Sequence, residues 1–260
     1  MNHGVEATTV EVNGHPCRVW SKGQGPLLGY LPGIGGLPRW MPFLDILSRE
    51  RRVIAPSLPG FPGAAGHDQL DTHFDWLLAT YDLLEKCGLA GADLVASSVS
   101  GALAADVAGV WPGFVKRLVL IAPFGLFNPD EPATDIWAQR PGHLSGLLCA
   151  NAQIYKDFVA QPDAADSIEW KVEQMRALEA AARFLFPTGN TGLAARLHRI
   201  RNKTLLVWGE QDRVMPISYA ERLCQGIAGA AVIKRVPGAG HLAELDAPGP
   251  VAEAILDFLR

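Results

Sequence analysis

Short, wholly apolar runs recur along the chain and alternate with segments in which apolar residues are spaced three or four positions apart. The runs at 94–96 and 118–121 are separated by such a helical pattern over 99–110. The same rhythm returns late, where the run at 204–208 is followed by helical spacing near 219–226. Continuous apolar strands that alternate with helices predict an α/β fold with a mostly parallel central sheet, flanked by helices on both faces.

The first third of the chain predicts further strands and turns. Asn13-Gly14 separates two short segments, 8–12 and 17–20, and is expected to form the turn of a hairpin. The other predicted strands lie at 27–31, 53–55 and 231–236, and the other predicted helices lie at 40–47, 74–84 and 251–259. Ligands bind at the carboxyl ends of the strands in an open α/β sheet, so chemically active residues are sought at those ends.

The middle of the chain breaks this alternation. From about 124 to 190 there is no buried-strand pattern, and helical spacing is clearest over 168–184. The segment 124–190 therefore predicts an all-helical insertion, with 1–123 and 191–260 forming the core domain. Part of its apolar surface would pack on the rim of the sheet and part would line a pocket, unless these side chains form only the core of the insertion itself.

Composition and charge exclude several classes of protein. With 260 residues, of which 48% are hydrophobic and 19% charged, the chain has enough apolar side chains for one large globular core. The formal net charge of −4, without a cluster of Lys and Arg, argues against a nucleic-acid partner. No apolar run approaches the length of a membrane span, and the first residues do not resemble a signal peptide. A cytoplasmic protein with no membrane partner is therefore expected.

The cysteines are scattered along the chain, with no Cys-x-x-Cys pair among them. They are Cys17, Cys87, Cys149 and Cys224. A metal site, a redox pair or a disulfide framework is therefore not expected, and no cofactor is implied. The pattern specifies no particular oligomeric state.

The most informative stretch is the end of the strand at 94–96, where an apolar run leads directly into serine. Ser98 is flanked two positions away on each side by the small residues Ala96 and Ser100, and a helical pattern follows at once. A tight strand-to-helix turn needs small flanking residues, and it presents a hydroxyl at the end of a buried strand. Ser98 is therefore the candidate nucleophile, with Ser97 and Ser100 as alternatives.

Acyl transfer by serine also requires a base and a group that orients the base, and the later strands offer both. Asp212 lies in the turn after the apolar run 205–208, with Glu210 as a nearby alternative. His241 follows the last predicted strand, in a glycine-rich loop before the final helix. Ser98 as nucleophile, His241 as base and Asp212 as orienting acid are thus the predicted catalytic residues.

A glycine-rich loop after the strand at 27–31 supplies the remaining part of such a site. In the stretch Pro-Gly-Ile-Gly-Gly at 32–36, the glycines let backbone N–H groups approach a substrate oxygen closely. The amides of Ile34 and Val99 are the predicted oxyanion donors, and Gly33 is predicted to border the substrate. A phosphate loop is the alternative, but no Lys-Ser/Thr pair follows the glycines and GxGxxG spacing is absent.

Together these residues resemble the α/β-hydrolase fold superfamily over essentially the whole chain. The resemblance lies in the order of the candidate serine, acid and histidine and in the glycine loop. Three further stretches look like signatures of that family: the Pro-Gly turn within 55–61, the acid turn within 205–216 and the histidine turn within 238–245. The resemblance implies that the insertion at 124–190 is a helical cap over the active site.

The resemblance implies a serine hydrolase that cleaves an ester of a small to medium, mostly apolar molecule through an acyl-enzyme. Its expected partner is a small molecule with an acyl or carbonyl group, which Trp137 and Phe158 of the insertion are expected to contact. The alternatives on this scaffold are a carbon–carbon bond hydrolase of ring-cleavage products and an enol-lactonase. The carboxylate of a dienoate substrate would require a basic side chain as its partner, for which Arg39, Arg140 and Arg183 are candidates. A non-catalytic protein that binds a small ligand is a further alternative.

Some positions depart from the usual pattern of the family. Pro32 stands where His is common, which removes a side chain that usually braces the oxyanion loop. Ser57 stands where Asp is common, so a structural hydrogen bond is expected to be replaced. Ala96 and Ser100 stand where Gly is common, and both are small enough for the turn. Serine at position 98, where an aspartate would be needed, argues against the haloalkane dehalogenase and epoxide hydrolase branches.

Overall fold

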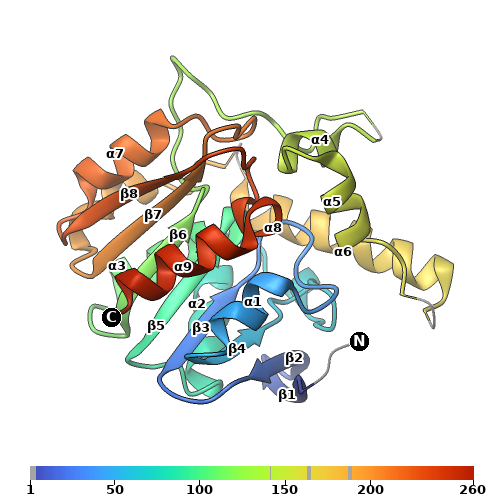
Figure 1. Ribbon diagram of the computed structural model, residues 1–260. Helices are drawn as coiled ribbons and strands as arrows, with labels where there is room; N and C mark the ends of the chain where they lie inside the picture. Colours follow the sequence, from blue (N-terminus) through green and yellow to red (C-terminus); the bar gives the residue numbers. More distant parts are fainter. Residues whose placement is uncertain (1–3, 141, 163–164, 187–188) are drawn as a thin grey trace.

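Strands from both ends of the chain form one eight-stranded sheet in the computed structural model, which describes residues 4–140, 142–162, 165–186 and 189–260 (Figure 1). The strands are β1 (Glu6–Val12), β2 (His15–Lys22), β3 (Leu27–Leu31), β4 (Arg52–Pro56), β5 (Ala92–Ser97), β6 (Val115–Ile121), β7 (Lys203–Gly209) and β8 (Ala231–Val236). The α-helices are α1 (Pro42–Leu47), α2 (His73–Lys86), α3 (Ser98–Val110), α4 (Leu144–Leu148), α5 (Ala152–Phe158), α6 (Ser167–Leu185), α7 (Ser218–Gly226), α8 (Ala243–Asp246) and α9 (Pro248–Phe258). Short 3₁₀ turns are η1 (His67–Gln69), η2 (Leu193–Ala195) and η3 (Leu197–Arg199). The predicted α/β fold is confirmed.

The strand order in the sheet is β1-β2-β4-β3-β5-β6-β7-β8. β2 pairs antiparallel with both β1 and β4, whereas β4, β3 and β5 to β8 run parallel to one another. The predicted hairpin turn is present, and Asn13 and Gly14 have φ values of 52° and 78°, as a type I′ turn requires. Because the parallel strands end at one edge of the sheet, the loops after β3, β5, β7 and β8 meet there.

Helices cover both faces of this sheet, as the pattern of apolar runs predicted. In Figure 1, α1 and α9 pack together in front of the sheet, while α2 and α3 pack together behind it. β5 is buried along its whole length, and α3 is buried at every position from Ser98 to Gly109. A strand buried on both faces has no reason to alternate polar and apolar residues, which explains the continuous apolar run at 94–96 in β5.

A buried ion cluster holds the amino-terminal ends of the central strands. Asp93 of β5 accepts hydrogen bonds from Arg117 of β6 at 2.7 and 2.8 Å and from Arg51, just before β4, at 3.0 Å. Arg51 also donates to the carbonyl oxygen of Leu259 at 2.5 Å, which ties the end of the chain to the sheet. The Asp93 side chain is 3% exposed, so its charge depends on these two partners.

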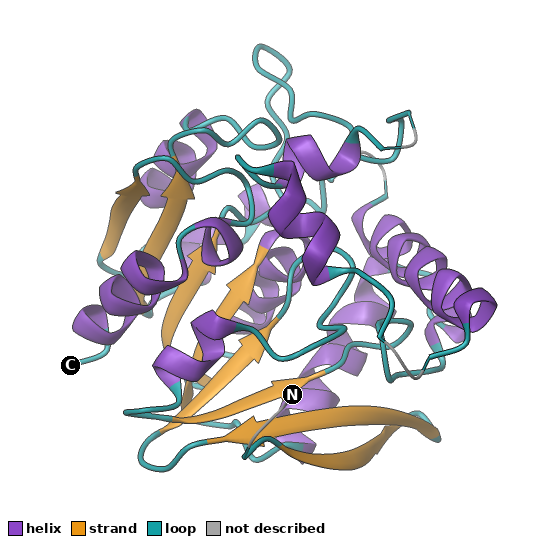
Figure 2. Ribbon diagram, turned by 45° about the vertical axis from the view of Figure 1, so that its right-hand side comes forward, coloured by secondary structure: helices purple, strands orange, loops and turns teal. Residues whose placement is uncertain are grey.

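The segment between β6 and β7 contains α4, α5 and α6 (Figure 2). It leaves and rejoins the core at neighbouring points, because the N–H of Gly125 donates to the carbonyl oxygen of Gly189 at 3.1 Å. α4 and α5 lie beyond the carboxyl ends of the central strands in Figure 2, and α6 contacts α2. The boundaries 124–190 of a separate cap remain a prediction. Within the described ranges no helix has the length and apolar character needed to cross a membrane.

Candidate active site

Ser98 lies on a sharp turn between β5 and α3, and its backbone φ is +51°. A positive φ is costly for a residue with a side chain, and it persists where the surrounding structure fixes the conformation. The helix after the turn packs tightly, since a Cβ on Gly101 would lie 2.6 Å from the Cβ of Pro123. The turn therefore holds the Ser98 hydroxyl at the edge of the sheet where the loops converge, and Ser98 is fully buried there.

The three predicted catalytic side chains form one hydrogen-bonded chain. The Oγ of Ser98 lies 2.8 Å from Nε2 of His241, and Nδ1 of His241 lies 2.9 Å from Oδ2 of Asp212. The network assigns the tautomer: the carboxylate can only accept, so Nδ1 carries the proton and Nε2 accepts from the serine hydroxyl. His241 is fully buried and the Asp212 side chain is 2% exposed, so solvent does not compete for these bonds.

Asp212 has both carboxylate oxygens engaged. Oδ1 accepts the backbone N–H groups of Val214 and Met215 at 2.8 and 2.9 Å, which leaves Oδ2 facing His241. The turn after β7 thereby orients the Asp212 carboxylate independently of its contact with the imidazole. The alternative acid, Glu210, is exposed, so the structure favours Asp212.

The alternative serines have other surroundings. The hydroxyl of Ser100 donates to the carbonyl oxygen of Pro32 at 2.5 Å, and thus links α3 to the glycine loop. Ser97 is buried, and its Oγ has no hydrogen-bond partner among the described residues. Neither hydroxyl is hydrogen-bonded to His241, which distinguishes both from Ser98.

The glycine loop after β3 approaches Ser98 closely. A Cβ on Gly33 would lie 3.2 Å from the Cβ of Ser98 and 2.8 Å from the side chain of Leu242, so a side chain would crowd the site. A turn follows, in which the N–H of Gly36 donates to the carbonyl oxygen of Gly33 at 3.0 Å. Val99 lies in the first turn of α3, where backbone N–H groups have no acceptor within the helix and attract negative charge.

The structure also shows what happens at two positions that depart from the family pattern. The Pro32 carbonyl accepts the Ser100 hydroxyl, so the glycine loop is braced from α3 without a histidine. The hydroxyl of Ser57 donates to the carbonyl oxygen of Pro62 at 2.8 Å, which closes the turn after β4. In each case a serine hydroxyl donates a hydrogen bond to a backbone carbonyl oxygen.

An apolar cavity of about 330 Å³ adjoins the histidine through Phe124. The ring of Phe124 packs edge-on against the His241 imidazole with centroids 5.7 Å apart, and against Trp137 at 6.3 Å. The cavity is lined by Phe124, Phe127, Pro132, Ala133, Thr134, Asp135, Trp137, Ala182, Leu185 and Phe186. Trp137, which also donates from Nε1 to the carbonyl oxygen of Leu178, is thus placed beside the site, whereas Phe158 lies outside this lining.

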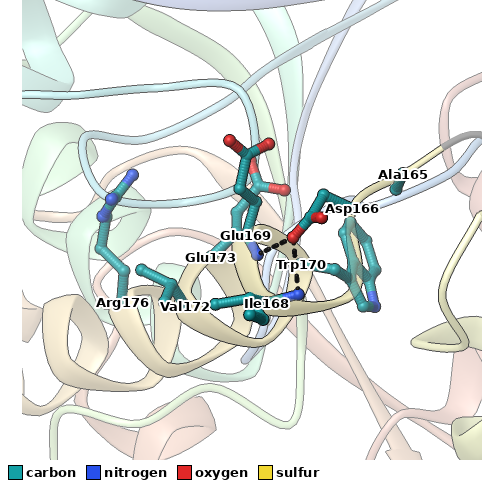
Figure 3. A pocket seen from close by; sticks show the side chains of 8 residues that line it. All are labelled: Ala165, Asp166, Ile168, Glu169, Trp170, Val172, Glu173 and Arg176. Carbon is teal, nitrogen blue, oxygen red and sulfur yellow. Dashed lines mark hydrogen bonds between the residues drawn. The ribbon is translucent and has the colours of Figure 1, made fainter.

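A second hollow, of about 520 Å³, is separate from these residues (Figure 3). All the side chains that line it belong to the first half of α6 or to the two residues before the helix. Asp166 caps α6 there by accepting the N–H groups of Ile168 and Glu169, as the dashed lines in Figure 3 show. This hollow includes none of the predicted catalytic residues.

Of the three arginines considered as partners for a carboxylate, two have other contacts and one is exposed. Arg39 donates a hydrogen bond to the carbonyl oxygen of Ala160, at the end of α5. Arg183 forms an ion pair with Glu179 at 3.6 Å, and Arg140 is exposed. None of the three lines the apolar cavity beside Phe124.

One buried ionisable group beside the site was not found by sequence reasoning. Glu244, in α8, is 2% exposed, and its Oε1 accepts from the Tyr30 hydroxyl at 3.3 Å. Its Oε2 has no hydrogen-bond partner in the described part of the chain, although the Ser97 hydroxyl lies near it. Burial raises the pKa of the Glu244 carboxyl, and the neighbouring hydroxyls and His241 offset part of that rise. A single glutamate among the residues 242–247 gives no sequence signal of such burial.

The raised pKa predicts how stability changes with pH. Glu244 contributes stability that is fully present below its ordinary pKa of 4.5 and is lost as pH rises through the raised value in the folded protein. Glu244→Gln removes this titration. The free energy of unfolding of the variant minus that of wild type should therefore increase from about pH 5 to about pH 8. Urea denaturation at both pH values measures the difference, with the exposed Glu253→Gln as control. A stability difference between Glu244→Gln and wild type that is equal at both pH values would contradict this account.

Within 4–140, 142–162, 165–186 and 189–260, no group of three or more His, Cys, Asp or Glu residues is placed to hold a metal ion. The arrangement at Ser98 is instead suited to moving a proton: a serine hydroxyl meets a neutral imidazole nitrogen whose other nitrogen faces a carboxylate.

Comparison with known proteins agrees with the fold. Residues 30–254 match the sequence profile described as the Alpha/beta hydrolase family, and the chain belongs to that family. It is 27% identical over 241 residues to 2-hydroxymuconate semialdehyde hydrolase of Pseudomonas sp. (strain CF600), covering 88% of this chain and 83% of that protein. It is 31% identical over 266 residues to the dihydrolipoyllysine-residue acetyltransferase component of the acetoin cleaving system of Pseudomonas putida, covering 96% and 68%.

Among solved structures, a bacterial membrane phospholipase A is similar, with a TM-score of 0.77 at 22% identity, over 98% of this chain and 86% of the other. At that identity the likeness concerns the fold alone. The predicted membership of the α/β-hydrolase superfamily is confirmed, and the protein is an enzyme of the hydrolase class on this fold.

Proposed function

We propose that this protein hydrolyses carboxylic esters with Ser98 as nucleophile, His241 as general base and acid, and Asp212 as the group that orients His241. One observation supports this most strongly. The His241 imidazole is hydrogen-bonded at 2.8 Å to a serine held on a strained turn, and at 2.9 Å to a carboxylate whose other oxygen is already engaged. That arrangement activates a hydroxyl without any further group.

In the proposed reaction, Ser98 Oγ bonds to the substrate carbonyl carbon while its proton moves to Nε2 of His241. The resulting oxyanion accepts hydrogen bonds from the amides of Ile34 and Val99. The tetrahedral species then expels the alcohol, which takes the proton from the imidazolium, and leaves an ester on Ser98. Water, deprotonated by His241, attacks this ester, and collapse of the second tetrahedral species returns the proton to Ser98 and releases the acid.

The surroundings of His241 favour an uncharged, apolar substrate. Phe124 packs against the imidazole and also lines a cavity whose described lining residues are mostly aromatic and aliphatic and include no Lys, Arg or His. Asp135 supplies the one charged side chain among the described lining residues, and its negative charge would repel a carboxylate. A neutral alkyl or aryl group of an ester would bury its surface there without an unpaired charge.

A carbon–carbon bond hydrolase is the second candidate, because a relative of 27% identity carries the name 2-hydroxymuconate semialdehyde hydrolase. The same nucleophile, base and oxyanion amides would serve a vinylogous diketone. A dienoate carboxylate would also need a cation near the site, and Arg39, Arg140 and Arg183 are engaged or exposed elsewhere. The arginine positions therefore favour the ester over the dienoate.

Substrate preference separates the two candidates. We expect p-nitrophenyl esters of short and medium acids to be hydrolysed with kcat/KM at least about tenfold above that for a 2-hydroxy-6-oxo-dienoate, because the dienoate must bury an unpaired carboxylate. Initial rates of both reactions are compared, with Ser98→Ala as the blank for background hydrolysis. A faster dienoate reaction would favour the carbon–carbon hydrolase. Tight binding of either compound without turnover would favour a binding protein.

A further inference from the structure

The loop that carries His241 is held on both sides of the imidazole by other segments of the chain. Immediately before it, the N–H of Gly240 donates to Oδ2 of Asp246 at 2.8 Å. Immediately after it, the N–H of Leu242 donates to the carbonyl oxygen of Leu148 at 2.8 Å. Leu148 ends α4, so one of the two bonds comes directly from the segment inserted between β6 and β7.

The bond from Gly240 is linked to the same inserted segment through the carboxylate of Asp246. Oδ2 of Asp246 accepts the N–H of Ala150 at 2.7 Å as well as that of Gly240, and Oδ1 accepts the N–H of Asn151 at 3.5 Å. The two loops touch without a gap, because a Cβ on Gly240 would lie 2.7 Å from the backbone nitrogen of Ala150. Asp246 is half-buried, so its charge keeps contact with water while these bonds form.

The opposite side of the His241 loop rests on the loop that carries the acid. The N–H of Gln211 donates to the carbonyl oxygen of Ala239 at 2.8 Å, one residue before Asp212. A Cβ on Gly209 would lie 2.1 Å from the carbonyl oxygen of Gly240, so the backbones are in direct contact. The histidine loop is thus enclosed between the acid loop and residues 148–151.

The same inserted segment also meets the glycine loop. The Tyr155 hydroxyl of α5 would lie 3.1 Å from a Cβ on Gly35, and the carbonyl oxygen of Ala160 accepts a hydrogen bond from Arg39. In Figure 1, α5 and α8 lie beside one another above the sheet, and the two helices are in contact. The insertion therefore contacts both the histidine loop and the proposed oxyanion loop.

We propose that Asp246 is a positioning residue that couples residues 148–151 to His241, so that catalysis depends on the seating of this part of the insertion. The proposal rests on the proposed role of His241. The imidazole must meet Ser98 at hydrogen-bond distance, and a misplacement of about 1 Å costs about 100-fold in rate. Asp246 fixes the residue before His241 to the insertion, and the Leu242 bond fixes the residue after it.

Two substitutions remove the coupling from opposite sides. Asp246→Ala removes the acceptor. Ala150→Pro removes a donor N–H, and the extended conformation of Cys149, with φ of −124° and ψ of 148°, suits a residue before proline. Each is expected to lower kcat by about 10- to 100-fold with KM little changed, because the misplaced group acts in the reaction and not in binding.

A conservative variant and a control separate positioning from general stability. Asp246→Asn keeps one oxygen that can accept both N–H groups, so it should restore most of kcat. Glu173→Ala removes the contact between α6 and the N–H of Gly63, 2.9 Å long, which does not touch the histidine loop, and it should leave kcat unchanged. All variants are compared well below their melting temperatures.

The double variant gives the sharpest test. If Asp246 acts through Ala150, adding Ala150→Pro to Asp246→Ala should lower kcat little further, because the shared contact is already lost. Fully additive losses, or wild-type kcat in a folded Asp246→Ala, would overturn the proposal. Activity that survives in Ser98→Ala would instead overturn the proposed function, so the two failures are distinguishable.

Discussion

Replacing Ser98 by alanine is expected to lower kcat for a p-nitrophenyl ester by about 10⁴-fold or more. Ser98 holds the only hydroxyl that is hydrogen-bonded to His241 among the described residues. Without it no acyl-enzyme forms, and His241 can only assist direct attack by water. The measurement is the ester hydrolysis rate of purified protein, corrected for spontaneous hydrolysis and for the folded fraction.

Ser97→Ala is the matched control for that loss. Ser97 is the neighbouring buried serine, and its Oγ has no hydrogen-bond partner in the described ranges, so removing it should change kcat little. A large loss in Ser97→Ala together with near-normal activity in Ser98→Ala would mean that the hydroxyls have been assigned to the wrong roles. Equal losses in both would indicate damage to the turn itself.

Replacing Asp93 by alanine is expected to destabilise the protein by about 3–5 kcal/mol. The substitution leaves Arg51 and Arg117 without their shared carboxylate, and the side chains of these arginines are only 8% and 17% exposed. Arg51 also holds the carbonyl oxygen of Leu259, so the end of the chain should loosen at the same time. Urea denaturation monitored by tryptophan fluorescence measures the change.

An exposed ion pair provides the comparison. Asp257 pairs with Arg260 at 2.7 Å, but its side chain is 70% exposed, so Asp257→Ala should cost less than about 1 kcal/mol. Similar losses of stability in Asp93→Ala and Asp257→Ala would show that burial adds little to the stabilising effect of the ion cluster at Asp93. Activity per folded molecule should be unaffected in both, because Asp93 lies at the amino-terminal end of β5, opposite the end that leads to Ser98, and Asp257 is an exposed residue of α9.

The core of the fold could be predicted because its signals are local. β5 and β7 contain the continuous apolar runs 94–96 and 205–208, and each strand ends at a turn that leads to a candidate catalytic residue. The small residues around Ser98 likewise signalled a tight turn, which has a φ of +51°. Some boundaries shifted for physical reasons: helical spacing begins at Trp40, but α1 begins at Pro42, since proline suits the first turn of a helix.

Features that depend on distant contacts could not be predicted in this way. Asp246 and Glu244 lie two residues apart, yet their environments differ. Asp246 accepts a hydrogen bond from Ala150 of the insertion, whereas Glu244 is buried. Phe158 and Trp137 are equally apolar, and only the packing of the insertion shows that Trp137 lines the cavity beside Phe124. The contact between Arg39 and the carbonyl oxygen of Ala160 could not be predicted for the same reason, because the two residues lie far apart in the sequence.

Covalent labelling tests the central claim most directly. The protein is treated with a fluorophosphonate, which forms a stable ester with an activated serine, and the site is located by mass spectrometry of its peptides. The account predicts a single adduct on Ser98, absent from Ser98→Ala and strongly reduced in His241→Ala. An adduct on another residue, or no adduct in a folded protein that hydrolyses esters, would contradict it.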